Sequence, residues 1–142
     1  MMVIGGGCHC GNISFQLDWH GDPEAIPARA CGCSFCVKHR GVWTSEPRSS
    51  LAVEIGDPAL ATTYSFATGT AAFHVCARCG VVPLVTCKMG GRLYAVVNVN
   101  TLEGVDPSIL ELAEADFEGE DLETRLARRR RNWIPSVSVR AR

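Results

Sequence analysis

The sequence predicts a mainly β fold of mostly antiparallel strands, with a short helical segment near the C-terminus. Stretches in which apolar and polar residues alternate recur along the chain and are separated by glycine-containing turns, which is typical of antiparallel strands and hairpins. One stretch, residues 118–133, has the charge order of a helix. Closely spaced cysteines at the ends of predicted strands indicate that a metal ion holds distant parts of the sheet together.

The length and composition indicate one domain spanning residues 1–142. Of these residues, 46% are hydrophobic and 20% are charged, as in a globular protein whose core needs no disulfide bonds. The net charge of −1 gives no electrostatic reason to expect a nucleic acid or an anionic membrane as partner. The longest apolar runs are too short to cross a bilayer. From the charge and the apolar runs together, we expect neither a nucleic acid nor a membrane as partner.

The first predicted strand is residues 12–19. This stretch alternates strictly, and the apolar residues on its one face are Ile13, Phe15, Leu17 and Trp19. Residues 51–55 form a second, shorter strand pattern. Residues 62–76 predict a hairpin with Gly69 in its turn.

Two further strands are predicted over residues 81–87 and 92–100. Gly90 and Gly91 lie between them, and a pair of glycines suits a tight hairpin turn. Pro83 has no backbone N–H to donate, so we expect its strand to lie at a sheet edge or to carry a bulge.

The predicted helical segment begins with acidic side chains and ends with arginines. This order complements the helix macrodipole, and Pro135 follows as a stop. The arginine run at 128–131 is therefore expected to stabilise the end of the helix rather than to bind a nucleic acid. The residues expected on the buried stripe are Leu122, Leu126 and Trp133.

Two tight turns predict a structural metal site. The motifs GCHCG and CARCG each end in a glycine, Gly11 or Gly80, which lets backbone N–H groups turn toward the sulfur atoms. Each motif adjoins a predicted strand, and a tetrahedral zinc ion with four thiolate ligands fits the pair. The expected ligands are Cys8, Cys10, Cys76 and Cys79. The spacing alone also permits the first pair to combine with Cys31 and Cys33 instead.

A second cluster, CGCSFC, is expected to bind a second zinc ion through Cys31, Cys33 and Cys36. Three protein ligands leave the fourth position of the metal open, as in catalytic zinc sites. Zinc in such a site lowers the pKa of a bound thiol, which can then attack an electrophilic carbon. Alternatively, Cys87 or His39 closes the coordination shell and this metal is also structural.

Three cations close to the triad in sequence could attract a small acidic thiol: Lys38, Arg40 and Arg48. The same residues also fit a solvated rim of ordinary surface charge.

The cysteines are expected to be reduced and to bind metal rather than to form disulfides. The N-terminal residues match no secretory signal, which favours a cytoplasmic location. Two of the spacings are C-x-C, and the ring that such a disulfide would close is too tight. We therefore expect two zinc ions per chain and no structural disulfide.

Taken together, the cysteine motifs resemble those of the glutathione-dependent formaldehyde-activating enzymes, a family that includes centromere protein V. The shared order is G-x-C-H-C-G at residues 6–11, C-x-C-x-x-C at 31–36 and F-x-x-C-x-x-C-G at 73–80, within a similarity that covers about residues 5–100. The resemblance implies curled antiparallel sheets around a zinc site, similar to the methionine-R-sulfoxide reductases. It also implies a structural zinc at the outer two pairs and a catalytic zinc at the triad. The implied reaction is the addition of a small-molecule thiol such as glutathione to formaldehyde, formally a carbon–sulfur lyase in reverse.

The chain departs from the family pattern at the triad, where Gly32 stands between the first two cysteines and Val37 follows the third. These differences bear on the substrate and leave the metal ligands in place. Two other functions are compatible with the residues. One is a binding module of the same fold in which both zinc ions are structural. The other is a methionine sulfoxide reductase with Cys87 as its redox thiol.

Overall fold

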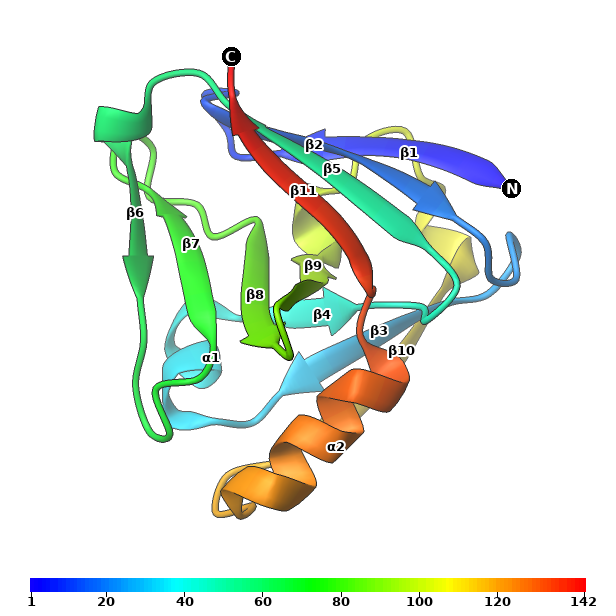
Figure 1. Ribbon diagram of the computed structural model, residues 1–142. Helices are drawn as coiled ribbons and strands as arrows, with labels where there is room; N and C mark the ends of the chain where they lie inside the picture. The colour runs from blue at the N-terminus through cyan, green and yellow to red at the C-terminus, as the bar shows by residue number, and fades with distance from the viewer.

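The computed structural model describes residues 1–142 and contains two β-sheets and two α-helices (Figure 1). The smaller sheet has the strand order β1 (Met2–Gly7), β2 (Ile13–Trp19), β5 (Ser50–Ile55) and β11 (Ser136–Ala141). The larger sheet has the order β10 (Leu110–Ala115), β3 (Ile26–Cys31), β4 (Val42–Thr44), β9 (Arg92–Asn98), β8 (Leu84–Met89), β7 (Ala72–Cys76) and β6 (Ala61–Tyr64). The helices are α1 (Ser34–His39) and α2 (Leu122–Asn132), with 3₁₀ turns at η1 (Pro58–Leu60), η2 (Val99–Thr101) and η3 (Pro107–Ile109).

The mainly β class is confirmed, but both sheets are mixed rather than wholly antiparallel. Strand β10 runs parallel to β3, with Leu110 opposite Ile26. Strand β11 runs parallel to β5, with Ser136 opposite Ser50. Parallel neighbours require long connections. Here β10 and β11 come late in the sequence, after the strands beside which they lie and after most of the other strands. The resemblance to methionine-R-sulfoxide reductases stays a prediction.

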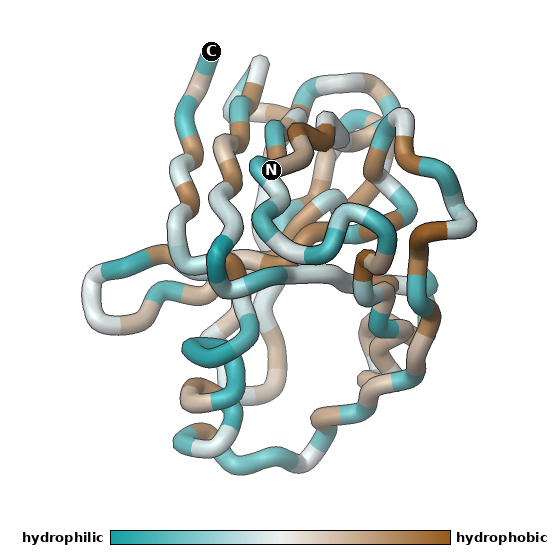
Figure 2. The backbone as a smooth tube through the Cα atoms, turned by 90° about the vertical axis from the view of Figure 1, so that its right-hand side faces the viewer, coloured by the Kyte–Doolittle hydropathy of each residue, from teal (hydrophilic) through white to brown (hydrophobic).

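Strand β2 confirms the alternation seen in the sequence. Its odd-numbered residues are buried, with Leu17 at 0% exposure, and its even-numbered residues are exposed or partly exposed. It pairs with β1 on one side and β5 on the other, both antiparallel. The hydropathy of strand β11 also alternates, and Figure 2 shows brown segments between pale or teal ones along the strand that ends at the C-terminus.

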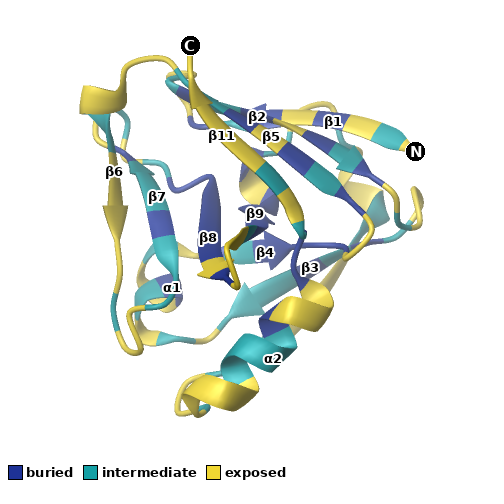
Figure 3. Cartoon of the chain, viewed as in Figure 1, coloured by how far each residue is buried: buried dark blue, intermediate teal, exposed yellow.

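The larger sheet is covered on both faces, because successive residues of β8 and β9 belong to two separate clusters of buried side chains. Leu84 and Val97 belong to the first cluster, which lies between the two sheets. Val85 and Val96 belong to the second cluster, on the other face. Strand β8 is therefore buried over most of its length (Figure 3), which explains its nearly continuous run of apolar residues.

Both predicted hairpins are confirmed. The β6–β7 turn contains Gly69 with a φ of 69°, and the β8–β9 turn consists of Gly90 and Gly91 with φ values of 57° and 77°. The prediction for Pro83 was wrong, because β8 lies inside the sheet between β9 and β7. Pro83 precedes the first residue of β8, where its missing N–H costs no ladder bond, and its carbonyl accepts the N–H of Asn98 at 2.8 Å.

The C-terminal helix is confirmed, but it begins at Leu122 rather than at residue 118. The carboxylate of Asp121 caps it by accepting the N–H of Thr124 at 2.8 Å, so the acidic residues before it belong to a loop. Leu122 is 46% exposed and does not belong to the buried stripe, whereas Trp133 is buried and Leu126 packs against the second cluster. Neither helix has the length and hydropathy that crossing a membrane would require.

Packing of the first cluster yields a direct stability prediction. We expect Leu17→Ala to lower the free energy of unfolding by about 2–5 kcal/mol, because the side chain is fully buried between the sheets. The neighbouring change Gln16→Ala removes an exposed side chain of the same strand and is expected to stay within about 0.5 kcal/mol. Urea unfolding of both variants checks this, and equal midpoints would contradict the burial pattern of β2.

Candidate metal centres

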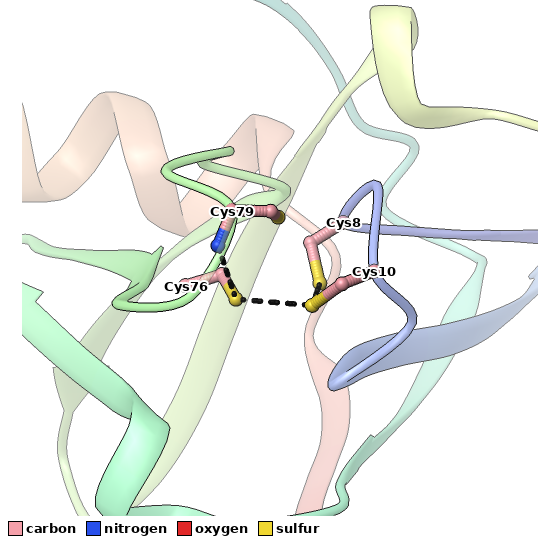
Figure 4. A group of neighbouring side chains, drawn as sticks. All are labelled: Cys8, Cys10, Cys76 and Cys79. Atoms are coloured by element: carbon pink, nitrogen blue, oxygen red, sulfur yellow. Dashed lines mark hydrogen bonds between the residues drawn. The ribbon is translucent and has the colours of Figure 1, made fainter.

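Four cysteines from two distant segments meet at one end of the sheets (Figure 4). Two of them follow β1, and the other two are the last residue of β7 and a residue of the loop that leads to β8. Their sulfur atoms all lie within 4.8 Å of one another, and the residues are Cys8, Cys10, Cys76 and Cys79. The structure therefore groups the first pair with the pair after β7, and not with Cys31 and Cys33.

The spacing of these four sulfur atoms fits a tetrahedral zinc ion. Ligands about 2.3 Å from a zinc ion lie about 3.8 Å apart at the corners of a tetrahedron. The Cys8 and Cys10 sulfur atoms are 3.8 Å apart, and those of Cys10 and Cys76 are 3.5 Å apart. All-sulfur tetrahedral groups of this size are typical of structural zinc sites.

Backbone N–H groups point at these sulfur atoms, as the two glycine motifs predict. Gly11 and Gly80 have φ values of 81° and 82°, which only glycine adopts readily. The N–H of Ile13 donates to the Cys8 sulfur at 3.2 Å, and the N–H of Cys79 donates to the Cys76 sulfur at 3.4 Å. Donors of this kind stabilise thiolates, which are the form that binds zinc.

The thiols of this group differ in proton affinity. Burial raises the pKa of Cys8 to about 11. Burial also acts to raise the pKa of Cys79, but backbone N–H groups and the thiols of Cys76 and Cys8 together outweigh it, and the net pKa falls to about 6. A divalent cation would remove the protons of the remaining thiols, because coordinated sulfur is deprotonated.

The second group of sulfur atoms, also within 4.8 Å of one another, consists of Cys31, Cys33 and Cys36. Cys31 ends β3, Cys33 caps the N-terminus of α1, and Cys36 lies in the first turns of that helix. The N–H of Cys36 donates to the Cys33 sulfur at 3.4 Å. Gly32 fixes the approach to the helix through a bond from its N–H to the carbonyl of Ala115 at 2.8 Å.

The end of β3 and the short helix α1 together bring the three sulfur atoms close to one another. Trp43 donates its indole N–H to the buried Cys36 sulfur at 3.4 Å. A hydrogen bond from the Cys36 thiol lowers the pKa of Cys31 to about 6, while the same bond and burial raise the pKa of Cys36. One thiolate supported by two neighbouring thiols is a donor set that can hold a zinc ion.

Neither of the other two candidates completes the triad. The Cys87 sulfur lies elsewhere in the second buried cluster and accepts an N–H of Arg129 at 3.4 Å. The His39 ring lies against Phe35 with ring centroids 4.3 Å apart, and its Nε2 is buried without a partner. No fourth Cys, His, Asp or Glu ligand atom joins the three sulfur atoms. The open-site interpretation is therefore the one that the geometry favours.

A cavity of about 480 Å³ adjoins the triad, and all three cysteines line it. A volume of this size suits a small organic ligand. Aromatic side chains form one part of its wall, namely Trp43, Phe66, Phe73 and Trp133. The tip of the β6–β7 hairpin and the helix α2 close it on two sides, so the cavity is built from segments far apart in the sequence.

The cations of this cavity are not the ones that the sequence indicated. Lys38, Arg40 and Arg48 do not line it, and Arg48 forms an ion pair with Glu46 at 2.6 Å. The cavity is lined instead by four other arginines, one from β3 and three from α2: Arg29, Arg125, Arg128 and Arg129.

Sequence reasoning missed the three arginines of α2 because their charge order already had an explanation at the end of a helix. A usable signal was present, since 125, 128, 129 and 132 are spaced as one face of a helix. The side chains at those four positions all line the cavity. The aromatic wall was less accessible to sequence analysis, because it depends on how the larger sheet, the β6–β7 hairpin and α2 pack.

Comparison with known proteins agrees with the geometry. The family model described as glutathione-dependent formaldehyde-activating enzyme matches residues 3–115. The fold is also similar to the crystal structure of a Rhodobacter sphaeroides protein, with a TM-score of 0.61 and 30% sequence identity. That similarity covers 78% of this chain and 99% of the other. The matched family segment contains both cysteine groups and ends before α2 begins.

Proposed function

This chain belongs to the glutathione-dependent formaldehyde-activating enzyme family, and we propose that it is a zinc-dependent enzyme that adds a thiol such as glutathione to a small aldehyde such as formaldehyde. The observation that carries this proposal is the three-cysteine group without a fourth protein ligand at the edge of a cavity. The proposed catalytic metal ligands are Cys31, Cys33 and Cys36, and the proposed structural ligands are Cys8, Cys10, Cys76 and Cys79.

In the proposed reaction, a carbon–sulfur bond forms between the thiol and the carbonyl carbon, and the thiol proton ends on the carbonyl oxygen. When bound at the triad, zinc supplies a Lewis acid that lowers the pKa of a thiol in its open position. The chain itself positions the triad through α1 and the Trp43 hydrogen bond. The aromatic side chains around the cavity exclude water from the reacting thiol.

An activity assay tests the proposal directly. We expect the zinc-loaded protein to accelerate formation of S-hydroxymethylglutathione from formaldehyde and glutathione above the rate without protein. Magnetisation-exchange NMR measures both rates in the same buffer. The same sample treated with a chelator until the triad is empty is the control, and it is expected to show the uncatalysed rate.

Metal stoichiometry separates the enzyme from a binding module with two structural zinc ions. We expect two zinc ions per chain, of which the ion at the triad is lost first to a chelator and responds to added glutathione. The physical reason is that the four-cysteine group is closed and the triad is open to the cavity. Elemental analysis during chelator titration measures this. One zinc per chain, held tightly and indifferent to millimolar glutathione, would contradict the enzyme proposal.

A further inference from the structure

The arginine Arg129 is unusual because it is a cation in the buried part of the protein. The residue is 6% exposed, and its guanidinium carbon lies 5.0 Å from the Trp133 ring centroid. Its Nη1 donates to the Thr70 hydroxyl at 2.9 Å and to the Cys87 sulfur at 3.4 Å. The side chain is therefore held in one orientation, and it lines the cavity beside the triad.

Only one end of this guanidinium is used by the protein. Both hydrogen bonds of Arg129 come from Nη1, while its Nε is buried without a partner. No carboxylate forms an ion pair with it. A buried charge without a counter-ion is costly, so a partner that is absent from the chain itself is indicated.

Of the four arginines that line the cavity, two have a carboxylate partner within the protein and two have none. Arg125 and Arg128 both form ion pairs with Glu120, at 3.7 Å and 3.0 Å. Arg29 resembles Arg129, because it has no ion pair and donates to the neutral Ser45 hydroxyl at 2.7 Å. Burial lowers the pKa of both unpaired arginines from the usual value, as expected for charges that are removed from water. The cavity thus contains two cations without a protein counter-ion.

We propose that Arg129 and Arg29 form a subsite that binds a carboxylate group of the ligand whose thiol reaches the triad. This inference rests on the proposed function, because it takes the cavity as the place where the thiol substrate binds. A carboxylate is the natural partner, since its two oxygens accept parallel hydrogen bonds from a guanidinium fork. The subsite selects thiols that carry an acidic group over neutral thiols of the same size.

One of the two arginines of the subsite comes from the C-terminal segment of this chain. Arg129 comes from α2, whereas the match to the family model ends at residue 115. The proposed metal ligands and Arg29 of β3 therefore lie within the matched family segment, whereas Arg129 lies outside it. Substrate preference can accordingly differ between relatives that share the same cysteines.

Binding of S-methylglutathione and of its diethyl ester to the zinc-loaded protein tests the subsite. S-methylglutathione keeps both carboxylates but has no free thiol, so its affinity does not depend on a zinc–thiolate bond. We expect calorimetry to give an affinity about 10- to 100-fold higher for the acid than for the ester, as for the loss of one charge-assisted contact. We expect Arg129→Gln to remove most of this difference. Arg131→Gln, an exposed change two residues further along the same helix, is expected to retain it.

The outcomes separate this proposal from the proposed function. Equal affinity of the acid and the ester for the unaltered protein, or no binding of either, would overturn the subsite whatever the enzyme does. Selectivity for the acid that Arg129→Gln abolishes would support the subsite even if formaldehyde were never turned over. If Arg129→Gln fails to fold, Arg29→Gln serves as the second variant, and retention of full selectivity by it would count against the proposal.

Discussion

Replacing Cys76 by serine is expected to unfold the protein. Cys76 is fully buried in the cluster between the two sheets, and its sulfur lies 3.5 Å from that of Cys10 in the first cysteine group. The free energy of metal binding at such a group adds to the free energy of folding, and it is on the order of 10 kcal/mol for small zinc domains. The net stability of a domain is only about 5–15 kcal/mol. Loss of one ligand therefore removes a large share of the total.

Thermal unfolding followed by circular dichroism measures the effect. We expect Cys76→Ser to lack a cooperative transition or to melt more than about 10 °C below the unaltered protein. Cys87→Ala is the matched control, because Cys87 is equally buried but belongs to neither cysteine group. A Cys76→Ser protein that melts together with this control would show that the four-cysteine group does not stabilise the fold.

The location of the four-cysteine group explains why the expected effect is so large. Cys8 follows β1 of the smaller sheet, and Cys76 ends β7 of the larger sheet. A metal held between them joins the two sheets at a place where no strand pairing does so. It closes a loop of more than sixty residues, and the stabilisation that a metal link provides grows with the length of the loop it closes.

The order of residues within a short segment was sufficient to predict a strand with one buried and one exposed face, and the turns of two hairpins. The alternation from Ile13 to Trp19 and the glycines of the β6–β7 and β8–β9 turns are short-range features, and each appears where it was predicted. The members of each close pair and of the triad were also predictable, because their spacing is a local feature, but which pairs meet in space depends on the fold. The single-domain organisation over residues 1–142 stays a prediction.

Elements that depend on distant partners were missed. Strand β3 (Ile26–Cys31) contains a proline and an arginine, and β10 (Leu110–Ala115) contains two glutamates, so neither shows a strand pattern alone. They become strands because each satisfies the other's backbone in a parallel pair. The helix α1 was hidden for another reason, since two of its six residues are Ser34 and Val37, which are weak helix formers in isolation. Its formation depends on the Cys33 cap and on packing against the aromatic cluster.

The same dependence on distant partners explains why the cations that lie near the triad in sequence are not those of the cavity. Lys38 and Arg40 are close to the triad in sequence, but they do not line the cavity. Arg129 is ninety-three residues from Cys36 and faces the same cavity, because α2 packs across the second buried cluster. Proximity in sequence was a poor guide to which charges line the cavity.

Replacing Cys33 by serine is expected to have the opposite profile to Cys76→Ser, because it should abolish activity and leave the fold intact. Cys33 is the N-cap of α1, and its sulfur accepts the N–H of Cys36 at 3.4 Å. Serine is a preferred N-cap residue, so the hydroxyl can take over this bond and preserve the helix. What serine cannot supply is the thiolate, and the triad is left with two sulfur ligands.

The expected loss of activity is large because the triad has no spare ligand. Changes to residues that merely orient metal ligands typically cost 10- to 100-fold in affinity or rate, so we expect at least about a 100-fold loss when a ligand itself is removed. We expect elemental analysis of Cys33→Ser to show one zinc per chain, with an unchanged melting transition. Ser34→Ala, at the next residue of the same cavity wall, is the matched control and should keep both ions. A Cys33→Ser protein that still binds two zinc ions and accelerates thiol addition would require the catalytic centre to lie elsewhere. The two serine variants together therefore distinguish a zinc that holds the sheets from a zinc that acts on a substrate, which the cysteine spacing alone could not do.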